Sequence, residues 1–295
     1  MCAMSKKQRM TPLMEIIHKG ERTVLMGILN VTPDSFSDGG QYETMEAALH
    51  HAEEMARDGA DIIDVGGEST RPGSEPVAAS EEMKRVLPVI HAIRDNLPVA
   101  ISIDTMKASV ARSALDAGAD MVNDVSGLTA DPEMAAVVAS AEAPICLMHL
   151  PSPPRVMQHN PVYRDVVAEV KAFLLRQAEA ARTTGISVER LILDPGFGFG
   201  KTAGHNLELL HRLRELVDMG YPIMIGTSRK STIGRVLGEL PIQDRLEGTA
   251  ATVALAIAAG AAIIRVHDVR EMARVARMTD AVVRDSARAR WLHNE

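Results

Sequence analysis

The chain has 295 residues, with 32 Lys and Arg against 39 Asp and Glu, so its formal net charge is −7. This acidic balance, with only four Phe, three Tyr and one Trp, argues against nucleic acid as a partner, because such binding needs basic patches and stacking aromatic rings. The two cysteines, Cys2 and Cys146, exclude a disulfide framework and a cysteine-rich zinc site.

The sequence contains no recognisable targeting or membrane segment. Lys6, Lys7 and Arg9 near the N-terminus are not followed by an apolar stretch, so a signal peptide is not predicted. The most apolar segment, Ala250–Ile264, is shorter than the roughly 20 residues that a membrane span needs. We therefore expect a cytoplasmic protein without membrane contact. Residues 1–19 are expected to form an arm and lead-in, and residues 20–295 a single domain.

Short apolar runs alternate with stretches of helical spacing along this domain. The predicted strands span residues 24–29, 61–65, 99–103, 121–122, 145–148, 191–193, 223–225 and 263–266. The predicted helices span residues 45–57, 80–96, 107–117, 131–140, 162–183, 207–217 and 269–287, with one more in two pieces at 229–237 and 243–259. Continuous apolar strands are typical of parallel strands covered on both faces. Eight strand–helix units predict an α/β protein with a single (β/α)8 TIM barrel, and a doubly wound open sheet is the alternative.

Polar or charged residues stand at the carboxyl ends of nearly all these strands, where the active site of a TIM barrel lies. They are Asn30, Asp64, Asp104, Asn123, His149, Asp194, Ser228, Arg265 and His267. Asn and Asp also favour loop starts and helix caps, which is the preferred interpretation for Asp124 and Asp268, and both interpretations stay open for Asp64. Arg265 lies inside an apolar strand, so its charge requires a protein carboxylate or an anionic ligand.

The residue types at these strand ends indicate the chemistry of a ligand. Basic side chains suit phosphate oxygens, and the candidates are Arg71, Arg229, Lys230, Arg265 and His267. Carboxylates and an amide suit a heterocycle with adjacent N–H donors, such as a 2-amino-4-oxo ring, and the candidates are Asp104, Asn123 and Asp194. No two histidines have zinc-ligand spacing, whereas the oxygens of Asn30, Asp34 and Asp38 suit Mg²⁺.

The stretch Leu191–Thr202, LILDPGFGFGKT, joins a predicted strand to three alternating glycines. A P-loop would need Gly where Pro195 stands, so that phosphate motif fails. The spacing of Gly198, Gly200 and Ala203 fits a relaxed dinucleotide pattern, but the next strand does not end in an acid. Asp194 as a helix cap competes with Asp194 as a ligand-binding carboxylate before a glycine-shaped loop. The convergence of polar strand ends favours the ligand-binding carboxylate.

Seven motifs follow one another along the chain. They are MGILNVTPDSFSDGG at 26–40, DIIDVGGESTRPG at 61–73, ISIDT at 101–105, NDVSG at 123–127, LDPGFGFGK at 193–201, SRKS at 228–231 and RVHDV at 265–269. In this order they closely resemble the dihydropteroate synthase family, from about Thr23 to the last predicted helix. The resemblance implies a TIM barrel that joins 6-hydroxymethyl-7,8-dihydropterin diphosphate to p-aminobenzoate by a dissociative, SN1-like displacement. It also implies a Mg²⁺ cofactor and a homodimer.

The resemblance implies roles for individual residues. The pterin would be held by Asp104, Asn123, Asp194, Lys230 and Arg265, of which all but Asn123 would be catalytic. The diphosphate would bind Asn30, Arg71, Arg265 and His267, with Mg²⁺ at Asn30 and Asp38. The p-aminobenzoate would bind Phe36, Thr70, Pro72, Phe199 and Ser231. Lys201 has no role in this interpretation.

Two alternatives are a pterin methyltransferase that uses methyltetrahydrofolate and a non-catalytic pterin-binding protein. The methyltransferase has no use for the anion-binding motifs around Asn30 and Ser228, and the intact motifs argue against a non-catalytic protein. The chain departs from the family after His149, where Leu150–Pro154 replaces the usual Met-Gln-Gly. We expect this departure to affect the loop and not the core chemistry.

Overall fold

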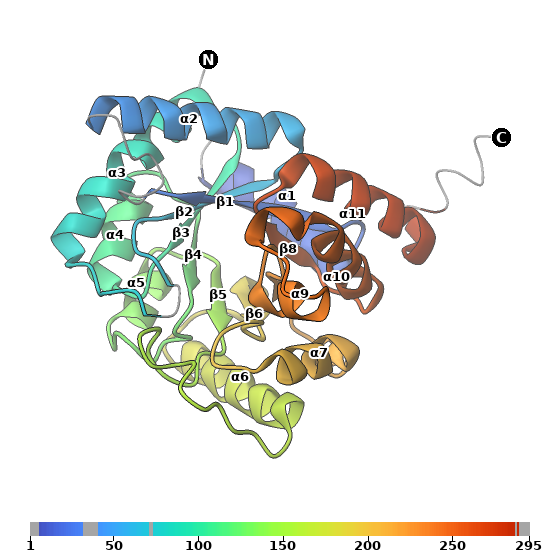
Figure 1. Cartoon of the computed structure of the whole chain (residues 1–295). Helices are drawn as coiled ribbons and strands as arrows, with labels where there is room; N and C mark the ends of the chain where they lie inside the picture. The colour runs from blue at the N-terminus through green and yellow to red at the C-terminus, as the bar shows by residue number, and fades with distance from the viewer. Residues whose placement is uncertain (1–5, 32–40, 71–72, 287, 289–295) are drawn as a thin grey trace.

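The computed structural model describes residues 6–31, 41–70, 73–286 and 288 of the chain, in which eight strands alternate with helices (Figure 1). The strands are β1 (Val24–Asn30), β2 (Ile62–Gly66), β3 (Ala100–Asp104), β4 (Met121–Asp124), β5 (Ile145–Met148), β6 (Leu191–Asp194), β7 (Met224–Ile225) and β8 (Ile263–Val266). The α-helices are α1 (Lys6–Lys19), α2 (Gln41–Asp58), α3 (Ala79–Asn96), α4 (Ala108–Asp116), α5 (Met134–Ser140), α6 (Val166–Thr183), α7 (Ala203–His211), α8 (Leu213–Val217), α9 (Ser231–Val236), α10 (Leu246–Ala258) and α11 (Val269–Val283). Two short 3₁₀ turns, Val188–Arg190 and Ile242–Asp244, precede β6 and α10. Among the described residues, no helix is both long and apolar enough to cross a membrane.

The strands are parallel and close into a barrel. Hydrogen-bonded neighbours follow the order β6-β5-β4-β3-β2-β1-β8-β7. The two ends of this order meet where Leu193 of β6 bridges Ile223 beside β7, and Leu193 N donates to Pro222 O at 3.0 Å. The helices lie around the outside of the strands (Figure 1). Because an open sheet would leave two unpaired edges, this closure confirms the predicted TIM barrel and excludes the doubly wound alternative.

Alternate residues of each strand point into the barrel and fill it in layers. The lower layer is apolar and contains Met26, Ile62, Ala100, Met121, Cys146, Ile192, Met224 and Ile263. Two positions further along the strands, the same inward face carries Asp64, Ser102, Asn123, Asp194 and Arg265. An apolar floor therefore supports a polar layer at the carboxyl ends of the strands.

Helix α1 covers the opposite, amino-terminal end of the barrel. Its buried residues Met10, Leu13 and Ile17 pack against the apolar lower layer. The expectation of an arm and lead-in at residues 1–19 missed this helix, whose pattern is obscured by Pro12 within its first turns. Tertiary packing of one apolar face stabilises the helix where propensity alone does not.

Helix α5 begins at Met134, three residues later than predicted. The carboxylate of Asp131 accepts hydrogen bonds from Ala108 N at 2.8 Å and from Glu133 N at 3.0 Å. One acid therefore satisfies the first turn of α4 and the turn that precedes α5, which the sequence pattern did not indicate.

Replacing Ile17 by alanine should lower the free energy of unfolding by about 2–4 kcal/mol, because large-to-small changes in a packed core cost about that much. Ile17 is only 3% exposed. Urea denaturation followed by circular dichroism measures the change, with Glu15→Ala on the exposed face of α1 as the control. Equal stability of the Ile17 variant and the wild type would show that α1 does not seal this end of the barrel.

Candidate active site

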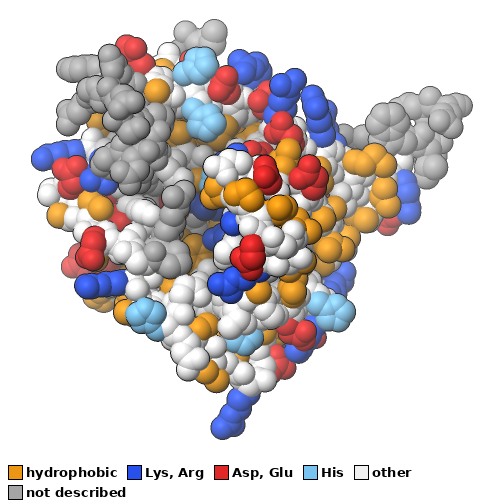
Figure 2. Space-filling view, viewed as in Figure 1, with side chains coloured by type: hydrophobic (Ala, Val, Ile, Leu, Met, Phe, Trp, Pro, Cys, Tyr) orange, Lys and Arg blue, Asp and Glu red, His pale blue; other side chains and the backbone are white. Residues whose placement is uncertain are grey.

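A cavity of about 970 Å³ opens at the carboxyl ends of the strands. Figure 2 shows the hollow on this face, with basic side chains inside it. The structure brings these predicted site residues to its wall: Asn30, Thr70, Asp104, Asn123, Asp194, Phe199, Lys230, Ser231, Arg265 and His267. The other predicted site residues, Phe36, Asp38, Arg71 and Pro72, lie outside the described residues. A cavity of this size suits small organic ligands.

Arg265 lies at the centre of the polar layer and bridges two carboxylates. Its Nε donates to Asp64 Oδ2 at 2.7 Å, and its Nη2 donates to Asp104 Oδ2 at 2.7 Å. The buried arginine therefore has protein carboxylates as partners, one of the two possibilities that its position in an apolar strand allowed. Nη1 makes no hydrogen bond within the described part of the chain and remains available to a ligand.

Asp64, for which the sequence left a capping role and a site role both open and assigned no ligand, is fully buried in this layer. Besides Arg265, its Oδ2 accepts a hydrogen bond from Asn123 Nδ2 at 3.0 Å. The Asp64 carboxylate thus orients both the guanidinium of Arg265 on β8 and the side-chain amide of Asn123 on β4. The sequence did contain a signal for this pairing. Asp64 and Arg265 carry opposite charges and each lies inside an apolar strand, and a buried charge needs a partner of opposite charge.

Burial changes the protonation of the acids in this layer. It raises the pKa of Asp104 to about 7, although the Arg265 charge opposes the shift. Burial likewise raises the pKa of Asp194 to about 6, and the 2.6 Å hydrogen bond from Gly196 N opposes it. For Arg265, burial is outweighed by Asp64 and Asp104, which raise the pKa and keep the guanidinium charged. The site therefore pairs one permanent cation with acids that titrate near neutral pH.

Three buried polar atoms of this layer have no hydrogen-bond partner among the described residues. They are Asp64 Oδ1, Ser102 Oγ and Asn123 Oδ1, from the adjacent strands β2, β3 and β4. Buried polar atoms are nearly always paired with protein, water or ligand. Because Asn123 also lines the cavity, its amide oxygen is positioned to accept a hydrogen bond from a ligand donor.

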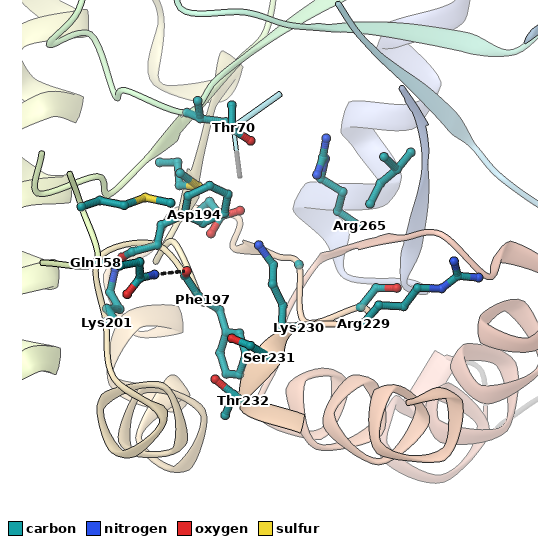
Figure 3. A pocket seen from close by; sticks show the side chains of 18 of the residues that line it. Thr70, Gln158, Asp194, Phe197, Lys201, Arg229, Lys230, Ser231, Thr232 and Arg265 are labelled. Carbon is teal, nitrogen blue, oxygen red and sulfur yellow. Dashed lines mark hydrogen bonds between the residues drawn. The ribbon is translucent and has the colours of Figure 1, made fainter. Parts of the chain in front are cut away.

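Lys230 lies between the polar layer and an aromatic ring. Its Nζ is 3.9 Å from the centroid of the Phe199 ring. Burial and the nearby Arg265 charge lower the pKa of Lys230 to about 8. In Figure 3 the Lys230 side chain extends toward Asp194 across the cavity, so it can reach two ligand groups at once.

The glycine loop after β6 is shaped by close packing against the loop that follows β5. A Cβ at Gly196, where φ is +68°, would lie 2.1 Å from His149 O, and one at Gly200, where φ is +57°, would lie 2.3 Å from Pro151 Cγ. Gln158 Nε2 donates to Gly198 O at 2.8 Å (Figure 3). Pro151, one of the residues that depart from the family pattern, therefore packs against the glycine loop, whereas the cavity wall is formed further along the same segment, by Met157 and Gln158.

Lys201 is buried inside this loop and organises it. Its Nζ donates to Gly196 O at 3.0 Å and to Phe199 O at 2.9 Å, and lies 3.0 Å from His149 Nδ1. Burial lowers the pKa of Lys201 to about 7 and that of His149 to about 3. These contacts fix the loop that presents Phe199, a function that the sequence interpretation did not give to Lys201.

Helix α7 begins directly after this loop, at Ala203. Thr202 and His205 form a capping box at its start, so the helix begins four residues before the predicted residue 207.

Three predicted roles near β7 and β8 are changed by the structure. Arg229 belongs to the cavity wall, but its guanidinium turns away from Lys230 and Asp194 (Figure 3), and its Nε donates to Asp268 Oδ2 at 3.0 Å. Asp268 therefore pairs with Arg229 and makes no side-chain cap on α11, contrary to its interpretation as a cap. His267 lines the cavity with Nδ1 3.0 Å from Ser228 Oγ, but burial and Arg265 lower its pKa to about 3. At neutral pH it is a neutral imidazole and not the basic group that was expected.

Asp124 adopts the capping role expected for it. Its carboxylate accepts hydrogen bonds from Ser126 N and Leu128 N, both at 2.8 Å. These bonds close the turn after β4 and leave Asn123 as the polar residue of this strand that faces the cavity.

The assembled site has acceptor oxygens at its floor, a charged guanidinium and a lysine in its wall, and an aromatic ring near its mouth. It can bind a planar heterocycle with N–H donors, together with an anionic group.

The chain is similar to proteins of known activity over most of its length. It matches the family model of the pterin binding enzymes at residues 26–267. It is 51% identical over 265 residues to a dihydropteroate synthase from Synechocystis sp., a match that covers 90% of this chain and 92% of the relative. The structure of a dihydropteroate synthase from Clostridium difficile, in the presence of pteroic acid, is 50% identical with a TM-score of 0.85, covering 90% of this chain and 98% of that one. The structure of a dihydropteroate synthase from Xanthomonas albilineans, in complex with 7,8-dihydropteroate, is 42% identical with a TM-score of 0.81. This match covers 88% of this chain and 94% of that one. The chain therefore belongs to the dihydropteroate synthase family of pterin-binding enzymes.

Proposed function

We propose that the chain joins 6-hydroxymethyl-7,8-dihydropterin diphosphate to p-aminobenzoate, giving 7,8-dihydropteroate and diphosphate. The observation that carries the proposal is the layer of acceptors formed by Asp104, Asn123 and Asp194 beside the basic groups of Lys230 and Arg265. The acceptors match the N–H donors of a pterin ring, and the basic groups match a diphosphate. The complex of a relative with 7,8-dihydropteroate supports the same product.

The pterin would bind on the polar layer, in contact with acceptors that the protein leaves free. Asp194 uses Oδ1 for Gly196 N and keeps Oδ2 for a ring N–H. Asn123 Oδ1 would accept from the ring, and Asp104 would do so through the oxygen that Arg265 does not bond. Lys230 would donate to the ring oxygen, with Arg265 against the ring face. Each ligand donor would then meet a preformed partner, which favours binding.

The diphosphate would bind at Asn30, His267 and Arg265. Arg265 can donate through Nη1 without releasing Asp64 or Asp104, and neutral His267 can offer a ring N–H. Arg71, outside the described residues, would add a second guanidinium. The cationic groups would lower the charge that develops on diphosphate as it leaves.

The p-aminobenzoate would bind at the mouth, where Thr70, Phe199 and Ser231 line the cavity. Its ring would pack beside Phe199 and its carboxylate would meet Ser231, at the N-terminus of α9. Phe36 and Pro72 would complete this subsite. Lys230 is close to Phe199 and would therefore lie between the two substrates.

The reaction we propose is a dissociative, SN1-like displacement at carbon. The bond between the pterin methylene and the diphosphate oxygen breaks, and its electron pair leaves with diphosphate. The ring stabilises the resulting cation, with support from the ionised Asp104 and Asp194. The arylamine nitrogen then forms the new C–N bond and loses a proton. Arylamines are weak nucleophiles, and attack on a preformed cation requires less nucleophilicity than displacement of the intact diphosphate.

We propose Mg²⁺ as the cofactor, held by Asn30 and Asp38. Asn30 fits this role because its amide offers a hard oxygen donor at the cavity wall and makes no hydrogen bond among the described residues. The described residues contain no cluster of three or more His, Cys, Asp or Glu that could hold a metal. Mg²⁺ typically uses one or two protein oxygens plus water and substrate phosphates, so this sparse donor set is compatible with it. When bound, Mg²⁺ would neutralise charge on the diphosphate.

We further propose a cytoplasmic homodimer that pairs through its last helices. Leu255 of α10 and Met278 and Val282 of α11 are apolar yet 60%, 66% and 58% exposed. The two helices pack side by side, and Figure 2 shows apolar side chains gathered over this region. An exposed apolar patch on neighbouring helices is typical of a protein interface. The cytoplasmic location agrees with a chain that has only two cysteines.

Mixing the protein with the pterin diphosphate, p-aminobenzoate and MgCl₂ should produce dihydropteroate and diphosphate in equal amounts. Chromatography with mass detection measures the first product, and a coupled pyrophosphatase assay measures the second. Asp194→Asn removes a proposed catalytic carboxylate and should lower kcat/KM by about 100-fold, as expected when a transition-state contact is lost. A folded wild-type protein that makes no dihydropteroate would refute the proposed activity.

Binding of the non-reactive pterin 6-hydroxymethylpterin should weaken as the pH falls from 8 to 5. Asp194, whose pKa is raised to about 6 by burial, must be ionised to accept a ring N–H. Below that pH the Kd should rise by up to about tenfold per pH unit, since only the ionised fraction binds. Isothermal titration calorimetry measures this, and Asp194→Asn should show a flatter pH dependence. A constant Kd across the range would contradict the assigned role.

Sedimentation equilibrium should give about twice the chain mass of 31.8 kDa for the wild type. The double variant Met278→Glu/Val282→Glu should sediment as a monomer, because two charges cannot be buried unpaired at an interface. Leu207→Glu, at an exposed apolar position of α7, is the matched control and should stay dimeric. A monomeric wild type at micromolar concentration would contradict the proposed homodimer.

A further inference from the structure

One lysine outside the cavity, from the β3–α4 unit of the barrel, joins two carboxylates of the preceding β2–α3 unit. Lys107 stands just before α4, and its Nζ lies 2.5 Å from Glu82 Oε2 of α3. The same Nζ forms an ion pair with Glu68 Oε2, in the loop that follows β2. Neither Lys107 nor Glu82 lines the cavity within the described residues, whereas Glu68 does. These three residues are called the loop-two clamp.

The clamp is buried to an unusual degree for charged residues. Glu82 is fully buried, and its Oε1 has no hydrogen-bond partner among the described residues. The Glu68 and Lys107 side chains are only 12% and 25% exposed. Buried ion pairs contribute little net stability compared with apolar packing, because desolvation offsets much of their attraction. A geometric role explains this arrangement better than a stabilising one.

The clamp works together with contacts that hold the start of the same loop. Arg85 Nη1 of α3 donates to Gly67 O at 3.0 Å. A Cβ at Gly67 would lie 2.8 Å from Val86 Cγ1, so only glycine allows the chain to pass this close to α3. Gly67 and Glu68 are therefore attached to α3 by a hydrogen bond, by packing and through the shared lysine.

The segment that the clamp fixes leads directly into the cavity wall. Glu68, Ser69 and Thr70 all line the cavity. On the other side, Lys107 is three residues from Asp104, the carboxylate that pairs with Arg265. The ammonium of Lys107 thus ties the loop after β2 to the loop after β3, and does so from behind the cavity.

We propose that Lys107 and Glu82 are positioning residues, which hold Glu68–Thr70 at the mouth and so form the subsite for the arylamine substrate. The pterin floor, built on strand residues, does not depend on them. The identity of the arylamine as p-aminobenzoate rests on the proposed function. The positioning itself is a property of this chain that can be measured without turnover.

Steady-state kinetics with each substrate varied in turn tests the proposal. Lys107→Met keeps most of the side-chain length but removes the charge, and should raise the KM for p-aminobenzoate by about tenfold, because a loop displaced by about 1 Å can cost that much or more. The KM for the pterin diphosphate should stay within about twofold of the wild type. Lys107→Arg can still bridge both carboxylates and should restore most of the affinity for p-aminobenzoate.

A matched control separates positioning from a general loss of stability. Arg94 Nη2 of α3 bonds Asp120 Oδ2 at 2.5 Å, at the start of β4 and so at the far end of the barrel from the cavity. Arg94→Met breaks an ion pair to the same helix and should lower the Tm while leaving both KM values unchanged. If Lys107→Met raises both KM values in parallel, or Arg94→Met reproduces its effect, the proposal is wrong.

Hydrogen–deuterium exchange of the ligand-free protein gives a second readout that needs no activity. Amides of residues 68–70 should exchange faster in Lys107→Met than in the wild type, and should be unchanged in Arg94→Met. Unchanged exchange at these amides in Lys107→Met would overturn the proposal even if the enzyme turns over as proposed. If the wild type lacks synthase activity but residues 68–70 still exchange faster in Lys107→Met than in the wild type, the proposed function is refuted and the clamp remains supported. If Lys107→Met does not fold, the double variant Glu82→Gln/Lys107→Met, which leaves no buried charge at position 82, replaces it.

Discussion

The guanidinium of Arg265 is the interaction on which the polar end of this barrel depends. It bonds Asp64 and Asp104 at 2.7 Å each, and Asp64 in turn orients Asn123. Without this cation, two carboxylates would be left inside a closed barrel with weak solvation, a state that costs several kcal/mol. Arg265 therefore makes it possible to place hydrogen-bond acceptors deep in the barrel, and those acceptors are what a pterin ring requires.

Several groups of the site are held in unfavourable surroundings that ligand binding would relieve. Asn123 Oδ1 is buried without a partner, and the pKa values of Asp104 and Asp194 are raised by burial. An apolar lower layer, sealed by α1, supports these unfavourable groups from beneath. A substrate with N–H donors and a negative charge would satisfy both the acceptors and the cations. Stability is thus supplied by the floor of the barrel, and binding specificity by the layer above it.

Much of the fold and of the candidate site could be predicted because both follow from local pattern. Strand β6 and its terminal Asp194 were identified from four residues and a following Pro-Gly. Helix α1 was missed because Pro12 interrupts its pattern and because the barrel end that its apolar face covers cannot be seen in the local sequence. Asp268 was interpreted as a cap because its partner Arg229 is 39 residues away and no periodicity connects them. The same limit hid the pairing of Asp64 with Arg265, which are 201 residues apart.

The sequence by itself determined the eight strand–helix units, the polar residues at the strand ends, and the family motifs that they belong to. Such features depend on neighbours within a few residues, where side-chain type and backbone preference act directly. Only the tertiary structure decided which of those polar residues face one another, and in which protonation state. It made His267 neutral, paired Arg229 with Asp268, gave Lys201 to the glycine loop and joined Lys107 to Glu68 and Glu82. These outcomes depend on how deeply each side chain is buried and on which remote segments lie close to it in space. The local sequence pattern determines neither.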